Sequence, residues 1–103
     1  MDKNFDDQVQ RNLMGKRLER EGNVLEAMSL YEANIDENFV GGFPYRRLAI
    51  LYSKRKLLSE EVRVPQKAVL VFKSLAYSNR TYINPKLNEF QERLDKAMNK
   101  ISE

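Results

Sequence analysis

The stretch Gly15-Lys16-Arg17-Leu18-Glu19-Arg20-Glu21-Gly22, followed by Ala27 and Tyr31, decides how this chain folds. A glycine inside a helix costs about 1 kcal/mol relative to alanine, so Gly15 indicates close approach of a second helix. Gly22 lies where the first helix should end, because glycine readily adopts the left-handed conformation that terminates helices. Ala27 and Tyr31 are four residues apart and therefore share one face of the next helix. The stretch predicts a helix, a tight turn and a returning helix.

Apolar residues recur at helical spacing along the rest of the chain, so the expected fold is all-α and forms a single domain. Pro44 suits the first turn of a helix and follows the turn signal Gly41-Gly42. The prediction is two antiparallel helical hairpins and a C-terminal capping helix. The first hairpin covers residues 5–37, with helices over 5–21 and 24–37; the second covers 44–79, with helices over 44–57 and 66–79; the capping helix covers 85–102.

The second hairpin repeats the apolar pattern of the first. Ala49 stands in the place of Gly15, and Phe72 stands in the place of Tyr31. Tyr52 similarly replaces Leu18, and Ala68 replaces Ala27. The residue before a proline disfavours helix, so Val64 should be extended before Pro65. Gly15 and Ala27 are twelve residues apart, whereas Ala49 and Ala68 are nineteen apart, so the second hairpin is expected to carry a seven-residue insertion that lengthens its turn.

Residues 8–76 resemble tetratricopeptide repeats, through Gly15, Gly22, Ala27, Tyr31 and their counterparts in the second hairpin. The stretch 43–52, FPYRRLAILY, also looks like that of small bacterial and phage tetratricopeptide-like proteins. The chain departs from the family pattern at Arg11, where an aromatic is usual, and lacks the closing proline. The resemblance implies a right-handed α–α stack that acts as a protein–protein interaction adaptor or regulator. A five-helix bundle without repeats is the alternative architecture.

Composition narrows the class of protein and its location. The 103 residues are 42% hydrophobic and 32% charged, which is typical of a soluble globular domain. Cysteine is absent, which excludes disulfides and fits a reducing compartment. No apolar run approaches the roughly 20 residues that cross a membrane, and the acidic N-terminus does not resemble a signal peptide. A soluble cytoplasmic protein that does not enter membranes is expected.

Catalysis is not expected, and no cofactor is predicted. Histidine and cysteine are both absent, which removes the commonest general base, the thiol nucleophile and most transition-metal sites. The carboxylate pairs Asp6-Asp7 and Glu60-Glu61 diverge on a helix and do not share one proton. Gly41-Gly42 lacks the lysine-bearing pattern of a phosphate loop. The chain is therefore predicted not to be an enzyme.

The net charge of +3 is unevenly distributed. Residues 1–40 hold five Lys/Arg and nine Asp/Glu, residues 41–80 hold nine and two, and residues 81–103 hold four of each. A basic middle segment suits an acidic partner, although solvated helix faces produce the same pattern. On the third helix, Tyr52 should be buried and Arg46 exposed on the opposite side.

The family resemblance places one face of the first helix of each hairpin in a concave groove. An acidic protein or peptide partner is expected there, bound by residues from both hairpins. The predicted partner-binding residues are Asn12, Lys16, Arg46, Arg47, Ile50 and Lys54. Two other functions stay open: a nucleic-acid-binding or nucleic-acid-associated protein that uses the basic face over 46–56, and a self-associating module such as a homodimer.

Overall fold

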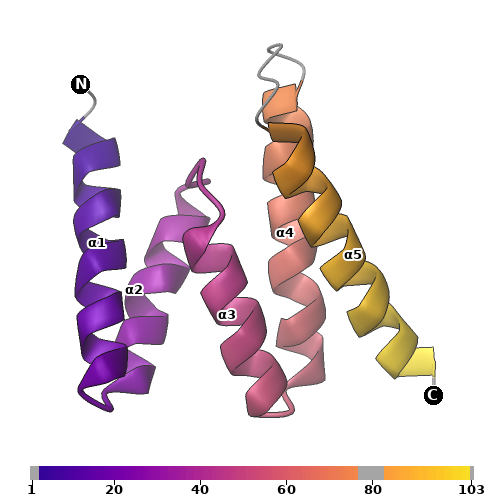
Figure 1. The fold of residues 1–103 in the computed structure, drawn as a ribbon, viewed down its shortest axis with the longest axis horizontal. Helices are drawn as coiled ribbons and strands as arrows, with labels where there is room; N and C mark the ends of the chain where they lie inside the picture. The colour runs from indigo at the N-terminus through magenta and orange to yellow at the C-terminus, as the bar shows by residue number, and fades with distance from the viewer. Residues whose placement is uncertain (1–2, 77–82, 103) are drawn as a thin grey trace.

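The computed structural model describes residues 3–76 and 83–102, and this part of the chain contains helices and turns but no strand. The all-α prediction is confirmed. Figure 1 shows the five helices, which run alternately down and up the molecule. Their bounds are α1 (Lys3–Arg20), α2 (Val24–Asp36), α3 (Phe43–Lys54), α4 (Leu58–Ala76) and α5 (Ile83–Ser102). The predicted end of the fourth helix at Asn79 lies outside the described residues.

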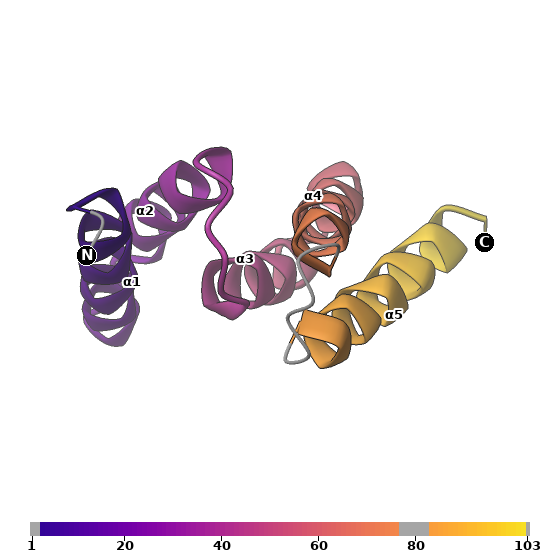
Figure 2. The same cartoon turned by 90° about the horizontal axis from the view of Figure 1, so that it is seen from above.

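Each helix packs against the next helix along the chain. Viewed from above, the helices form a zigzag, with α2 and α4 on one side and α1, α3 and α5 on the other (Figure 2). The molecule is a slab of 44 × 39 × 18 Å. Helix α4 packs more extensively against α5 than against α3, so α5 is a major part of the core as well as a cap. No helix in the described part of the chain is long and apolar enough to cross a membrane.

Gly15 is buried where α1 crosses α2, as its sequence context predicts. A Cβ atom at this position would lie 2.7 Å from Cζ and 2.9 Å from the hydroxyl oxygen of Tyr31. The tyrosine ring is fully buried, so it has little room to move away. The helical glycine is therefore explained by an aromatic ring that occupies the space of its missing side chain.

The turns after α1 and α3 have the same backbone geometry, 34 residues apart. Gly22 has a φ of 85° and Lys56 a φ of 58°, both left-handed. The amide of Gly22 donates to the carbonyl of Glu19, and the amide of Lys56 donates in the same way to Ser53. The following amides, at 23 and 57, close the longer bond of a Schellman motif. The predicted seven-residue insertion is therefore wrong, because both turns have the same length.

Helix α4 runs through Pro65, which corrects the prediction that residues 58–64 form an extended turn. Proline removes one helical hydrogen bond and disfavours helix in the residue before it. Tertiary packing overrides this local preference, because Val64 and Pro65 are fully buried. Val64 continues a core stripe through Ala68 and Phe72. Counting from the equivalent turns, Tyr31 corresponds to Pro65 and Ala27 to Glu61, so the predicted matches of Phe72 with Tyr31 and of Ala68 with Ala27 are wrong.

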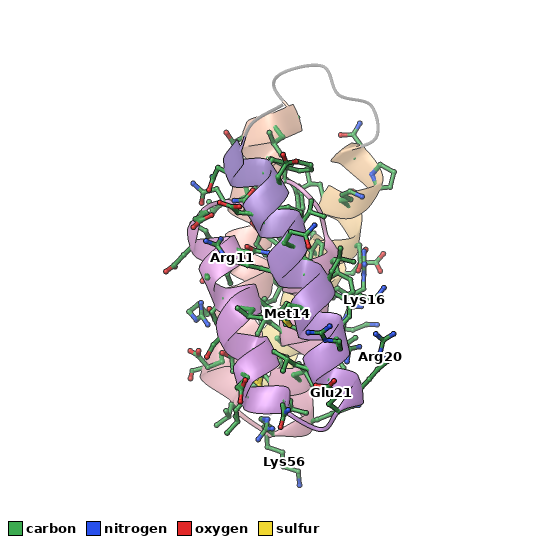
Figure 3. The ribbon with its side chains drawn as sticks, turned by 90° about the vertical axis from the view of Figure 1, so that its left-hand side faces the viewer. Arg11, Met14, Lys16, Arg20, Glu21 and Lys56 are labelled. Carbon is green, nitrogen blue, oxygen red and sulfur yellow. The ribbon has the colours of Figure 1, made fainter. Side chains whose placement is uncertain are left out.

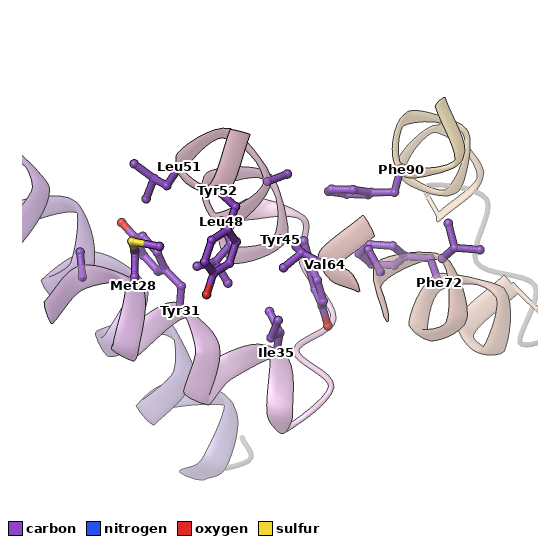
Figure 4. Packing of buried hydrophobic residues seen from close by; sticks show 14 residues of the cluster. Met28, Tyr31, Ile35, Tyr45, Leu48, Leu51, Tyr52, Val64, Phe72 and Phe90 are labelled. Atoms are coloured by element: carbon purple, nitrogen blue, oxygen red, sulfur yellow. The ribbon is translucent and has the colours of Figure 1, made fainter. Parts of the chain in front are cut away.

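An aromatic cluster joins α3, α4 and α5 (Figure 4). Tyr45, Phe72 and Phe90 are fully buried. Their ring centroids lie 5.6 Å apart for Tyr45 and Phe72, 6.0 Å for Tyr45 and Phe90, and 5.7 Å for Phe72 and Phe90. Tyr52 is also buried, as predicted, with 8% of its surface exposed. The cluster fixes where α5 lies relative to α3.

A polar cluster joins α1 to α2. Asn34 is fully buried, and its amide nitrogen donates to the Gln8 carbonyl and to Asn12 Oδ1, both at 2.8 Å. Asn34 Oδ1 accepts from Arg11 at 3.0 Å, and Arg11 also pairs with Glu37 at 2.8 Å. Arg11 therefore has polar partners at the position where the resembled family usually carries an aromatic.

Candidate functional site

Two neighbouring hollows lie between α1, α3 and α5, and we call their lining residues the basic face. The α1–α3 hollow has a volume of about 290 Å³ and is lined by Lys16, Glu19, Arg20, Phe43 and Arg47. The α3–α5 hollow has a volume of about 400 Å³ and is lined by Ala49, Ile50, Ser53, Lys54, Glu61, Arg93, Lys96 and Lys100. Both hollows are lined by α3, one through Phe43 and Arg47 and the other through residues 49–54, so they are neighbours along this helix.

Helix α1 directs its charged side chains to opposite sides. In Figure 3, Lys16 and Arg20 lie on the side of α1 away from α2, while Arg11 lies toward α2. The Lys16 ammonium nitrogen lies 5.5 Å from the centre of the Phe43 ring. This distance suits a cation–π contact. The aromatic ring of α3 thus positions a cation of α1 at the edge of the α1–α3 hollow.

Arg47 ties α3 to α1 through Glu19. Its Nε and a terminal nitrogen donate to the two carboxylate oxygens at 3.1 and 2.5 Å, and the Tyr31 hydroxyl donates to the same carboxylate at 2.6 Å. Burial raises the pKa of Glu19. The hydrogen bonds from Arg47 and Tyr31 and the charge of Arg47 together lower it by more than burial raises it, so the net pKa lies below its usual value. Arg47 therefore holds two helices together at the α1–α3 hollow.

Arg46 ties α3 to α5, which corrects the prediction that it is simply exposed. It donates to both carboxylate oxygens of Glu89, at 2.7 and 2.8 Å, and its side chain retains 37% exposure. Arg93 donates to the same carboxylate at 3.2 Å. The hydrogen bond from Arg46 lowers the pKa of Glu89. The adjacent residues Arg46 and Arg47 thus bind the helices on either side of α3.

Helix α5 supplies basic residues that sequence reasoning missed. Arg93, Lys96 and Lys100 line the α3–α5 hollow opposite Lys54. Their spacing of three and four residues places them on one helix face, which is the signal that was available. The equal numbers of charges in 81–103 concealed this one-sided arrangement. That these three residues line one hollow follows only from the packing of α5 against α3.

The six predicted partner-binding residues do not form one groove. Lys16 and Arg47 line the α1–α3 hollow, and Ile50 and Lys54 line the α3–α5 hollow. Arg46 lines neither hollow and pairs with α5. Asn12 accepts a hydrogen bond from α2. Four of the six residues therefore lie on the basic face, and the other two hold helices together.

A third hollow, of about 650 Å³, lies on the α2 side and is less suited to charge recognition. Leu25 and Leu57 border it and are 68% and 46% exposed. Glu32, one of its two carboxylates, is already bound by the Tyr52 hydroxyl and by Arg63, both at 2.5 Å. Its other charged residues, Asp36 and Arg55, have opposite signs, so this hollow lacks the excess of positive charge that the basic face has.

Comparisons with known proteins do not assign the chain to a group. No protein family, curated protein or solved structure matches it. Within residues 3–76 and 83–102, the structure contains no group of three or more His, Cys, Asp or Glu side chains placed to hold a metal ion. The functional argument therefore depends on the basic face.

Acidification is expected to destabilise the protein below about pH 4.5, the ordinary value for glutamate. Glu19 and Glu89 have lowered pKa values in the folded state, so their stabilisation is complete above that pH and is lost as both carboxylates protonate. Urea unfolding across a pH series should show a loss of roughly 1–2 kcal/mol from these two ion-paired groups.

The matched variants test the cause of this pH dependence. Glu19→Gln combined with Glu89→Gln should make the acid limb of the stability curve less steep. Glu21→Gln removes an exposed carboxylate from the turn that follows α1 and should leave the limb unchanged. The hydrogen bond from Arg11 also lowers the pKa of Glu37, so part of the limb should remain; a limb as steep as that of the wild type would contradict the assignment.

Proposed function

We propose that this chain is a non-catalytic, tetratricopeptide-like module that binds an acidic segment of a protein partner through its basic face, as an adaptor or regulator. The observation that carries the proposal is a set of cations from three helices that border the two hollows. They are exposed and have no ion pair among the described residues. These cations are Lys16 and Arg20 on α1, Lys54 on α3 and Lys96 on α5.

The backbone repeat supports the tetratricopeptide-like part of the proposal. The left-handed turns at Gly22 and Lys56 recur after 34 residues, which is the period of that repeat. Helices α1, α3 and α5 then correspond to the inner row that forms a binding surface. A cytoplasmic location and a right-handed stack are expectations of the same proposal.

The pattern of charge favours a protein segment over a nucleic acid. The carboxylates of Glu19 and Glu61 lie among the cations of the two hollows. A continuous phosphate backbone would approach both acids, whereas a peptide places its acidic and apolar side chains individually. Phe43 and Ile50 supply apolar contact in the respective hollows. Rigid helices reduce the ordering cost of binding such a segment.

Charge reversal of the basic face tests the proposal. The variant Lys16→Glu/Lys54→Glu/Lys96→Glu should bind a glutamate-rich, leucine-containing peptide at least about tenfold more weakly at about 0.15 M salt, where charges beyond about 8 Å are largely screened. Fluorescence anisotropy of the labelled peptide measures the affinity. The control Arg17→Glu/Lys73→Glu/Lys86→Glu makes the same charge change at residues that line neither hollow of the basic face.

The outcomes separate the alternatives. Equal binding by wild type and both variants would contradict the proposal, and equal loss in both variants would indicate diffuse electrostatics. Tighter binding of single-stranded DNA or RNA, with a steep salt dependence, would favour the nucleic-acid function. A concentration-dependent molar mass in light scattering without any ligand would favour self-association.

A further inference from the structure

The α3–α5 hollow has an excess of positive charge. Its lining includes four cations, Lys54, Arg93, Lys96 and Lys100, and one carboxylate, Glu61. The α1–α3 hollow is less one-sided, with three cations and the carboxylate of Glu19, which Arg47 already binds. At the α3–α5 hollow, Lys100 is paired with Glu61, and Arg93 is paired with Glu89. Lys54 and Lys96, which have no ion pair within the described residues, therefore leave two positive charges, one more than a single carboxylate ligand would neutralise.

Two of the four cations are held in place by the protein itself. Lys100 donates to Glu61 at 2.5 Å and to the Ser53 hydroxyl oxygen at 3.4 Å. Arg93 donates to Glu89 at 3.2 Å, which is in turn bound by Arg46. These contacts fix one wall of the hollow before any ligand arrives. Preorganised donors lose less conformational freedom on binding.

The other two cations are free to close on a ligand. Lys54 on α3 and Lys96 on α5 are exposed and form no ion pair within the described part of the chain. They come from different helices, so an anion between them would bridge α3 and α5. Ala49 and Ile50 add an apolar contribution to the lining.

We propose that the α3–α5 hollow binds a phosphate monoester, carried as phosphoserine or phosphothreonine on the acidic segment of the partner; this rests on the proposed function. A phosphomonoester carries nearly two negative charges at neutral pH and three strong acceptor oxygens. Lys54 and Lys96 bind its oxygens from two sides, and Lys100 and Arg93 add positive charge at the wall. Apolar residues beside the phosphorylated position contact Ile50.

A bounded hollow suits one phosphate group better than a chain of phosphates. Glu61 on α4 lines this hollow, and Glu19 on α1 lines the neighbouring α1–α3 hollow. A nucleic-acid backbone that continued past the hollow toward α1 would meet the Glu19 carboxylate. The ligand class is therefore a phosphopeptide, and nucleic-acid binding is an opposing outcome of the test.

The experiment compares three synthetic peptides that share one acidic, leucine-containing sequence and differ at a central residue: serine, phosphoserine or glutamate. Fluorescence anisotropy at about 0.15 M salt should show at least about tenfold tighter binding of the phosphoserine peptide than of the serine peptide, from added charge-assisted hydrogen bonds. Lys54→Ala/Lys96→Ala should reduce this preference to about twofold or less. The control Lys73→Ala/Lys86→Ala should retain it, and thermal melting should confirm that both variants fold.

Each contrary result overturns the inference in a distinct way. Equal affinity for the serine and phosphoserine peptides would overturn it while leaving the proposed function intact, provided that both peptides respond to reversal of Lys16. If the control variant lost the preference for the phosphoserine peptide as much as Lys54→Ala/Lys96→Ala did, the preference would come from the overall charge of the protein and not from this hollow. Binding of single-stranded DNA or RNA that exceeds phosphopeptide binding and depends on Lys54 and Lys96 would assign the hollow to nucleic acid. Absence of binding by all three peptides would overturn both the inference and the proposed function.

Discussion

Replacing Phe72 by alanine is expected to lower the free energy of unfolding by about 3–5 kcal/mol, the range for large aromatic truncations in cores. The Phe72 side chain is fully buried on α4 and contacts the rings of Tyr45 on α3 and Phe90 on α5. Its removal leaves a cavity at the junction of three helices, which the remaining rings fill only in part. Urea denaturation monitored by circular dichroism measures the loss.

A control on the same helix separates core packing from helix propensity. Leu70 is two residues away and 64% exposed, so Leu70→Ala should change the free energy of unfolding by about 0.5 kcal/mol or less. Similar losses in Phe72→Ala and Leu70→Ala would contradict the orientation of α4. The Phe72 variant should also bind peptides more weakly at the α3–α5 hollow, because the same aromatic cluster positions α5 and its cationic residues.

Substitutions at Gly15 are expected to destabilise the protein, although most other residues form helices better than glycine does. Alanine is a better helix former than glycine by about 1 kcal/mol, so an unhindered position would gain stability. A Cβ at residue 15 would instead lie within 3 Å of the buried Tyr31 ring. Gly15→Ala should therefore lose stability, and Gly15→Leu should lose about 3 kcal/mol or more, at the upper end of overpacking effects.

The comparison with Gly22 isolates the role of contact. No atom lies within 4 Å of a Cβ at Gly22, but its φ of 85° strains any other residue. Gly22→Ala should cost about 1 kcal/mol through the backbone alone. The Gly15 losses should diminish in a background with a smaller residue at Tyr31, whereas the Gly22 loss should not. A more stable Gly15→Ala protein would show that α1 and α2 are farther apart than the structure places them.

Local signals were sufficient to predict the helical class and most helix bounds. Apolar spacing and the Gly41-Gly42-Phe43-Pro44 turn located α2 and α3 to within a few residues. Gly15 also predicted its own contact, because a costly residue in a helix requires a compensating neighbour. These inferences succeeded because the causes, periodicity and backbone conformation, act over a few residues.

Contacts between distant parts of the chain determine the helical conformation at Pro65 and the ion-pair partners of Arg46 and Arg47. Local rules place an extended turn before Pro65, but burial against the core keeps α4 helical through it. Glu89 is 43 residues from Arg46, and Lys100 is 39 residues from Glu61, so no local pattern shows that they pair. The basic face has the same origin. Its cationic residues were visible in the sequence as separate helical stripes, but their gathering around two hollows depends on the docking of α1 and α5 against α3, which burial of the aromatic core drives.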